Sequence, residues 1–194
     1  VLFRSDRIYI HDLALPLMIL GNDNVVYKNS FAQRNESTTT GDPTPVTHSE
    51  FASISFNPST NLNFYNSIFE DMEGTAIIAV MNGADVTGLN YFNNVAYYTP
   101  TASPQTGFSN GFFTCTNSGT TCTNVNIYNN TFVNIPNRVA INITSSAESV
   151  TNMIVKNNLW WCDAASCGDA AHTVNAQITY DNNWYGGVTY TSGE

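Results

Sequence analysis

The chain has 194 residues, of which 11% are charged, and six Lys and Arg residues against fifteen Asp and Glu residues give it a net charge of −9. A surface with this charge does not neutralise phosphates, so nucleic acid is excluded as the expected partner. The same charge repels an anionic polysaccharide unless a cation such as Ca²⁺ bridges the two.

A short phrase recurs seven times along the chain, with two apolar residues in alternation before a polar residue that is suited to a turn. These polar residues, called anchors below, are Asp12, Asn29, Asn66, Asn93, Asn129, Asn157 and Asn182. In the phrase VNIYNNTF at residues 125–132, the period of two predicts a strand with Val125 and Ile127 inside. Copies of one strand and one turn must stack to bury their apolar sides, so the whole chain, 1–194, is expected to be one solenoid domain.

A second apolar run follows the anchor in several copies of the phrase. These runs cover residues 51–56, 75–80, 111–115 and 138–143. Together with the strand before the anchor and an inward position just after it, they predict three short strands in each turn of the solenoid. No stretch of eleven residues has a convincing helical period, so an all-β fold is expected.

The phrases NLNFYNSIF, NVNIYNNTF and NMIVKNNLW resemble the repeat of the right-handed parallel β-helix family, the pectate-lyase-like superfamily. The resemblance covers essentially the whole chain and implies a right-handed single-stranded parallel β-helix (solenoid) of about seven coils. It also implies an internal ladder of side-chain amides, formed by Asn29, Asn66, Asn93, Asn129, Asn157 and Asn182. Because the same repeat occurs in lyases, hydrolases, epimerases, adhesins and phage tailspikes, it specifies a fold more than an activity.

Two long polar segments interrupt the repeat, one at residues 32–50 and the other at residues 97–110. Both are rich in Pro, Thr, Ser and Gly, as loops are. They follow the anchors of the second and fourth copies, so they are expected to leave the same side of the rod with the third copy between them. This arrangement predicts a polysaccharide-binding cleft, and the other interpretation is ordinary variation in loop length.

The third copy carries three carboxylates within four residues, at Glu70, Asp71 and Glu73. Such a group is suited to Ca²⁺, whereas the other interpretation is a solvated acidic turn. In the β-helix polysaccharide lyases, an Arg or Lys removes the proton beside a uronate carboxylate that Ca²⁺ holds. The resemblance therefore implies Glu73 with Arg138 as the catalytic pair, although a single surface Arg also fits a structural role.

Several motifs of the family's enzymes are missing from this sequence. The polygalacturonase signatures NTD, DD, GHG and RIK do not occur, nor do the DPHE motif of the epimerases and the R-x-P-x-x-R motif of the pectate lyases. His11, His48 and His172 are scattered, and none has a partner at metal or triad spacing. Whether the protein is an enzyme is therefore open at this stage.

The outward position just before each anchor forms a predicted column along the rod. It reads His11, Lys28, Tyr65, Phe92, Tyr128, Lys156 and Asp181. Its three consecutive aromatic residues predict a carbohydrate-binding strip, with Asn63, Asn90 and Asn126 beside them as hydrogen-bonding groups. The alternative is a ladder that stabilises the sheet or lies under a neighbouring chain.

The four cysteines form two close pairs, Cys115 with Cys122 and Cys162 with Cys167, and two local disulfides are the simplest pairing. A metal site is the alternative, but neither pair has C-x-x-C spacing. Local disulfides indicate an oxidising compartment, so a secreted or cell-surface protein is expected. The sequence contains no apolar run of eighteen residues and therefore predicts no membrane span.

Two classes of function follow from these patterns. The first is an extracellular carbohydrate-active β-helix that engages polysaccharide between the two long loops, with lyase-like cleavage and Ca²⁺ as its enzymatic form. The second is a non-catalytic structural or adhesive solenoid segment of a filament, tailspike or surface protein. Because a solenoid has an open sheet edge at each end, we also expect end-to-end contact with other chains or with flanking coils.

Overall fold

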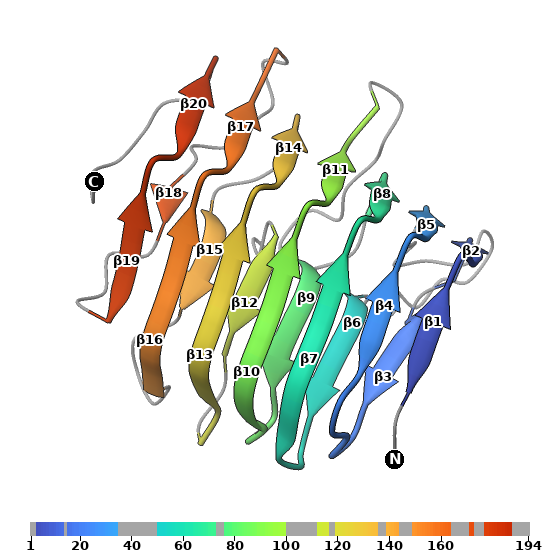
Figure 1. Cartoon of the computed structure of the whole chain (residues 1–194), viewed down its shortest axis with the longest axis vertical. Helices are drawn as coiled ribbons and strands as arrows, with labels where there is room; N and C mark the ends of the chain where they lie inside the picture. Colours follow the sequence, from blue (N-terminus) through green and yellow to red (C-terminus); the bar gives the residue numbers. More distant parts are fainter. Residues whose placement is uncertain are drawn as a thin grey trace, which may run out of the picture.

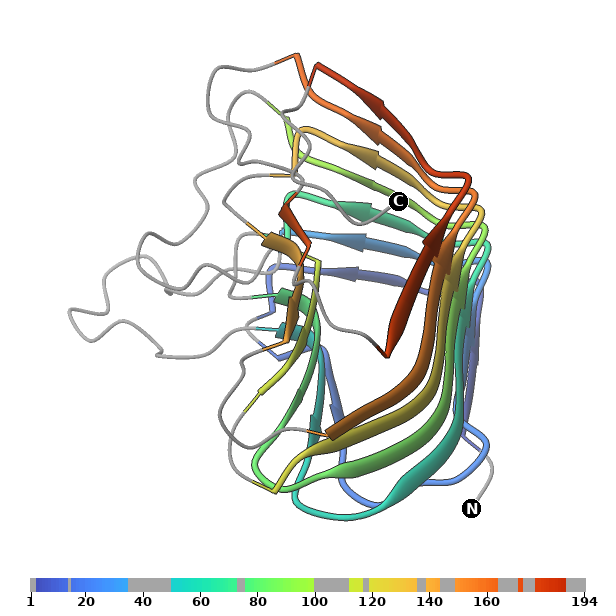
Figure 2. The same ribbon diagram turned by 90° about the vertical axis from the view of Figure 1, so that its left-hand side faces the viewer.

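The computed structural model describes residues 3–13, 15–34, 50–72, 76–99, 112–116, 119–135, 139–143, 149–163, 171–172 and 177–187. Within these residues, short strands follow one another in a repeating order and assemble into three parallel sheets, A, B and C (Figure 1). Viewed along the rod from its C-terminal end, the three sheets surround a common interior (Figure 2). The predicted all-β parallel solenoid of about seven coils is confirmed.

The strands of each sheet come from successive coils, numbered 1 to 7 from the N-terminal end. Sheet A contains β1 (Arg4–Asp6), β4 (Val26–Lys28), β7 (Ser59–Tyr65), β10 (Asp85–Phe92), β13 (Thr121–Tyr128), β16 (Ser149–Lys156) and β19 (Ile178–Asp181). Sheet B contains β2 (Tyr9–His11), β5 (Phe31–Gln33), β8 (Ile68–Glu70), β11 (Val95–Tyr97), β14 (Thr131–Val133), β17 (Leu159–Trp161) and β20 (Trp184–Gly186). Sheet C contains β3 (Leu17–Ile19), β6 (Glu50–Ser55), β9 (Ala76–Met81), β12 (Phe113–Cys115), β15 (Val139–Ile143) and β18 (Ala171–His172).

The corner between sheets A and B is formed by the six anchor asparagines, which all have left-handed backbone conformations with φ of 50 to 55°. Asn tolerates this conformation better than most residues, which explains why it recurs at the corner. The anchor side chains are exposed, so they do not form the predicted internal ladder. This assignment was wrong by one residue for Asn29, Asn66, Asn93, Asn129, Asn157 and Asn182.

An internal ladder does exist, and it is formed by the residue after each anchor. Its members are Ser30, Ser67, Asn94, Asn130, Asn158 and Asn183. In each step the backbone N–H of one member donates to the side-chain oxygen of the next, as from Asn94 to Asn130 at 2.9 Å and from Asn130 to Asn158 at 3.0 Å. The left-handed anchor leaves its own side chain at the outer corner and places the following side chain inside.

The first copy of the phrase was also placed incorrectly by the sequence pattern. Asp12 does not lie at the A–B corner; its coil-1 position is taken by Arg7, with φ of 56°. His11 accordingly lies on sheet B beside Gln33, and Asp6 occupies the column position next to Lys28. Alternating apolar residues occur on both sheets, so the period of two does not show which sheet a strand joins.

Aromatic rings fill the interior of the rod in a continuous chain from coil 2 to coil 6. In spatial order these are Tyr27, Phe51, Phe69, Tyr91, Phe112, Phe132 and Trp160, with successive ring centroids 3.9 to 5.6 Å apart. Burial raises the pKa of Tyr27 and of Tyr91 well above the usual range. Both phenols therefore act as neutral core residues and stabilise the fold by packing.

A disulfide joins Cys115 of β12 to Cys122 of β13 and confirms the first predicted pair. Both cysteines are buried. The bond links sheet C to sheet A through two strands that are consecutive in the chain. The second predicted pair remains a prediction, because Cys167 lies outside the described residues. Within the described part of the chain, no helix is long and apolar enough to cross a membrane.

Candidate functional site

The two long loops connect the same pair of sheets. The first joins β5 to β6 and the second joins β11 to β12, so both run from sheet B to sheet C, and the β8–β9 connection lies between them. Most of each loop, at residues 35–49 and 100–111, lies outside the described residues, as do Glu73 and Arg138. The predicted cleft and the predicted catalytic pair therefore remain predictions.

The two described carboxylates of the third copy, Glu70 and Asp71, already form hydrogen bonds with neighbouring residues. Asp71 accepts hydrogen bonds from the backbone N–H of Thr99 at 2.6 Å and from its hydroxyl at 2.8 Å. Burial, followed by hydrogen bonding to Glu70, raises the pKa of Tyr97 to about 12. Among the described residues no group of three His, Cys, Asp or Glu side chains is arranged to hold a metal ion. A Ca²⁺ site that includes Glu73 stays a prediction.

The predicted aromatic strip is present on the outer face of sheet A. Tyr65 and Phe92 stack with centroids 4.9 Å apart and an interplanar angle of 7°, and Phe92 and Tyr128 stack at 4.9 Å and 2°. Both faces of the Phe92 ring are thus covered by its neighbours. A sugar ring could contact this strip mainly through ring edges, so the geometry favours the stabilising ladder over a platform for sugar faces.

The three asparagines beside the strip are also arranged as a ladder. Asn90 donates to the side-chain oxygen of Asn63 at 3.0 Å, and Asn126 donates to that of Asn90 at 3.0 Å. Each bond stabilises the stacking of one coil on the next. Because these amides are partly occupied by one another, they offer a ligand fewer free hydrogen-bonding groups than the sequence suggests.

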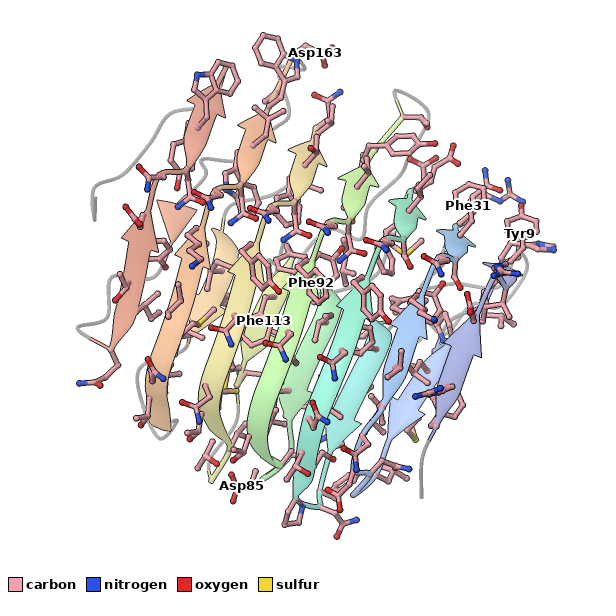
Figure 3. The ribbon with its side chains drawn as sticks, in the orientation of Figure 1. Tyr9, Phe31, Asp85, Phe92, Phe113 and Asp163 are labelled. Atoms are coloured by element: carbon pink, nitrogen blue, oxygen red, sulfur yellow. A yellow bond between two sulfur atoms is a disulfide. The ribbon has the colours of Figure 1, made fainter. Side chains whose placement is uncertain are left out.

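A shallow, open groove lies over the A–B corner and the adjoining part of sheet B in coils 1 to 3, with a volume of about 540 Å³. Its lining residues are Arg7, Ile8, Tyr9, Asn29, Ser30, Phe31, Asn66 and Ile68. One wall is aromatic and apolar, and the other carries side-chain amides and a guanidinium group. Figure 3 shows Tyr9 and Phe31 beside each other on adjacent strands of sheet B, away from Phe92 of sheet A.

The aromatic wall of the groove is held in place by contacts on several sides. Tyr9 stacks on Phe31 with centroids 5.2 Å apart at 13°, and on His11 with centroids 4.8 Å apart at 27°. The Tyr9 hydroxyl donates to Oε1 of Gln33 at 2.6 Å. The Tyr9 ring is therefore oriented before any ligand arrives, although the residue remains 55% exposed.

His11 belongs to a charged cluster that joins coil 1 to coil 2. Arg34 donates to both carboxylate oxygens of Asp12, from Nε at 2.6 Å and from Nη2 at 3.0 Å. His11 Nδ1 lies 2.6 Å from Oδ2 of Asp12. Hydrogen bonding from Arg34, and then from His11, holds the pKa of Asp12 well below its usual range. The ionised Asp12 accepts from Nδ1–H and fixes the orientation of the His11 ring.

This cluster is not evident from the sequence, because its members come from two different coils. His11 has a partner in its direct neighbour Asp12, although not one at metal or triad spacing. The available signal was Arg34, which lies at the end of the equivalent strand of the next coil. Stacked coils bring such positions together even though 22 residues separate them.

The polar side of the groove is organised around Asp6. Asn29 donates to Oδ1 of Asp6 at 3.0 Å, and Lys28 Nζ lies 3.3 Å from Oδ2. Hydrogen bonding from Asn29, followed by Lys28, lowers the pKa of Asp6. Arg7 is only 3.8 Å from the same carboxylate, but its side chain is 82% exposed. The guanidinium group is therefore accessible to a ligand in the groove.

Comparison of the chain with protein-family models, curated proteins and solved structures finds no match. The parallel solenoid and its amide ladder are supported by the sheet topology and hydrogen bonds described above. The finer likeness to pectate-lyase-like proteins rests on the sequence phrases alone.

Proposed function

We propose that this protein is an extracellular β-solenoid that binds polysaccharide in the groove over coils 1 to 3. The lining of that groove is the observation that carries the proposal. A sugar has an apolar ring face and a rim of hydroxyl groups. The wall of Tyr9, Phe31 and Ile68 suits the face. The amides of Asn29 and Asn66 bond Asp6 and each other, and their remaining hydrogen-bonding capacity suits the hydroxyls.

The fixed geometry of the groove supports the same proposal. A ligand that meets a Tyr9 ring already held by Phe31, His11 and Gln33 loses less free energy to ordering of the protein. The Asp12–Arg34 pair also stabilises the groove, because it links the ends of β2 and β5, the strands that carry Tyr9 and Phe31. The groove is thus suited to weak, repeated sugar contacts on a rigid surface.

The extracellular location is supported by the buried Cys115–Cys122 disulfide, since such bonds persist in oxidising compartments. The proposal concerns binding. Lyase-like cleavage by Glu73 and Arg138, with Ca²⁺, remains a separate prediction from the sequence. A purely structural or adhesive role is the alternative that stands if no polysaccharide binds.

The test is affinity gel electrophoresis with a panel of soluble polysaccharides, comprising mixed-linkage β-glucan, xyloglucan, galactomannan and polygalacturonate. Tyr9→Ala is expected to weaken binding about tenfold or more, which corresponds to about 1.4 kcal/mol. Tyr65→Ala is the matched control, because it makes the same change in the sheet A strip and is expected to retain binding. Absence of binding to every polymer would overturn the proposal, and so would equal loss in both variants.

A further inference from the structure

One row of outward side chains runs along sheet B through all seven coils. In register from coil 1 to coil 7, it reads Tyr9, Phe31, Ile68, Val95, Thr131, Leu159 and Trp184. The row contains apolar or neutral side chains throughout and no charged one. It begins at the groove over coils 1 to 3 and continues along the rod beyond it.

A second aromatic pair lies at the far end of sheet B, and one of its two members, Trp184, belongs to this row. Trp161 and Trp184, on the adjacent strands β17 and β20, stack with centroids 5.8 Å apart at an interplanar angle of 4°. They are 42% and 53% exposed. Both indoles are therefore accessible to a ligand, whereas Phe92 has a stacked ring on each of its two sides.

Gly186 makes room for this pair. A Cβ atom at Gly186 would lie 2.3 Å from the Trp184 ring and 2.5 Å from the Trp161 ring. Trp161 is the register partner of Gly186. The two indoles therefore lean over the sheet at the place where any other residue would put a side chain. This packing gives coils 6 and 7 a broad aromatic surface.

The two aromatic pairs are separated along the axis of the rod. Phe31 on coil 2 and Leu159 on coil 6 are four coils apart, which is about 19 Å at the spacing of parallel strands. Ile68, Val95 and Thr131 lie between them. A linear ligand that covers both pairs must therefore run along the rod, across the strands of sheet B.

We propose that one uncharged polysaccharide chain lies along the outer face of sheet B, with the Tyr9–Phe31 groove as one subsite and the Trp161–Trp184 pair as a second. This inference rests on the proposed function and adds the second subsite, the direction of the chain and its lack of charge. A neutral chain fits because the row has no charged side chain and the protein has a net charge of −9. A polysaccharide fits because it presents sugar faces repeatedly along one line, as the row presents apolar groups.

Two subsites on one polymer predict a strong dependence on chain length. Once one subsite is occupied, the second binds an intramolecular ligand at a high effective concentration. An octasaccharide long enough to cover both pairs is then expected to bind about a hundredfold more tightly than a trisaccharide of the same polymer. A trisaccharide reaches only one pair at a time.

The experiment is isothermal titration calorimetry with a trisaccharide and an octasaccharide from mixed-linkage β-glucan, with polygalacturonate oligomers as the charged comparison. Trp184→Ala is expected to reduce octasaccharide affinity to the trisaccharide level, and Trp161→Ala serves as a second variant if Trp184→Ala does not fold. The wild-type protein gives a test without any substitution. Trp160 is buried, so a change of tryptophan emission with the octasaccharide reports on Trp161 and Trp184.

The outcomes separate this inference from the proposed function. Equal affinity for the two lengths, or unchanged binding in both tryptophan variants, overturns the second subsite while binding at the groove stands. Tighter binding of the polygalacturonate oligomer overturns the assignment of an uncharged chain. If neither length binds and no polymer of the panel binds, both the inference and the proposed function are wrong.

Discussion

Asn130 links three coils of the interior through one side chain. Its Nδ2 donates to the backbone carbonyl of Tyr91 at 3.0 Å and to Oδ1 of Asn158 at 3.0 Å, while its Oδ1 accepts from the backbone N–H of Asn94 at 2.9 Å. The neighbouring anchor, Asn129, is exposed at the corner. Two adjacent asparagines therefore have different physical roles, one in hydrogen bonding and the other in backbone conformation.

Asn130→Ala is expected to lower the free energy of unfolding by about 2–4 kcal/mol. The change leaves buried polar groups without partners, and each such group costs about 1–3 kcal/mol. Asn129→Gly is the matched control, because Gly also adopts the left-handed conformation, and its cost is expected to be below about 1 kcal/mol. Urea denaturation measures both. Equal destabilisation would show that the interior ladder is not formed by the residue after the anchor.

The Asp12–Arg34 pair predicts a dependence of stability on acid pH. The folded-state pKa of Asp12 is lowered, so its contribution is complete above the ordinary Asp pKa of about 4 and is lost as the pH falls below that value. Wild-type protein should therefore lose more stability between about pH 4 and pH 2 than Asp12→Asn does. Thermal denaturation across this range measures the difference, and parallel curves for the two proteins would contradict it. Added salt should reduce the effect, because the pair is exposed.

The fold could be predicted from the sequence because its strongest signal is repeated. Each copy of the phrase specifies the same alternation, so inward residues such as Val125 and Ile127 were identified correctly. The position of the ladder could not be read in the same way. Paired polar residues such as Asn129 and Asn130 both fit a turn, and only the left-handed backbone of the first decides which side chain points inside.

The candidate site was harder to predict because it is made by register between coils. Tyr9, Phe31 and Ile68 form one wall, yet loops of unequal length separate them in the sequence. The misplaced first copy also hid the site, since it put His11 in the wrong column. The outward aromatic column of sheet A could be predicted because each of its three members directly precedes an anchor. From coil 2 onward, the members of the sheet B row instead come two residues after an anchor.

Gly187 provides a test of the last described corner. Its φ is 70°, and a Cβ there would lie 1.8 Å from the backbone carbonyl oxygen of Cys162. Gly187→Ala is expected to cost about 2–5 kcal/mol, by left-handed strain together with steric overlap. Gly83→Ala is the control, because Gly83 has φ of 75° but nothing within 4 Å of an added Cβ, so about 1–2 kcal/mol is expected. Similar unfolding midpoints for the two variants would show that coil 7 does not pack on coil 6 as described.

The aromatic strip and the sheet B row should respond to substitution in opposite ways. Phe92 lies between Tyr65 and Tyr128, and each aromatic pair contributes about 0.5–1.5 kcal/mol beyond the area it buries. Phe92→Ala is therefore expected to lower stability by about 2–3 kcal/mol and to leave polysaccharide affinity unchanged. Tyr9→Ala, at an exposed position, removes the stacking on Phe31 and His11 and should lower affinity about tenfold, with a stability change of about 1–2 kcal/mol.

Measuring the unfolding midpoint and the affinity of both variants separates the two surfaces. The reverse pattern, in which Phe92→Ala abolishes binding at nearly unchanged stability, would return the carbohydrate site to sheet A. That result would mean that sugars contact the ring edges of the strip and the free amide groups of Asn90 and its neighbours. The face-to-face stacking argues against it, because a ring covered on both faces has little apolar surface left for a sugar.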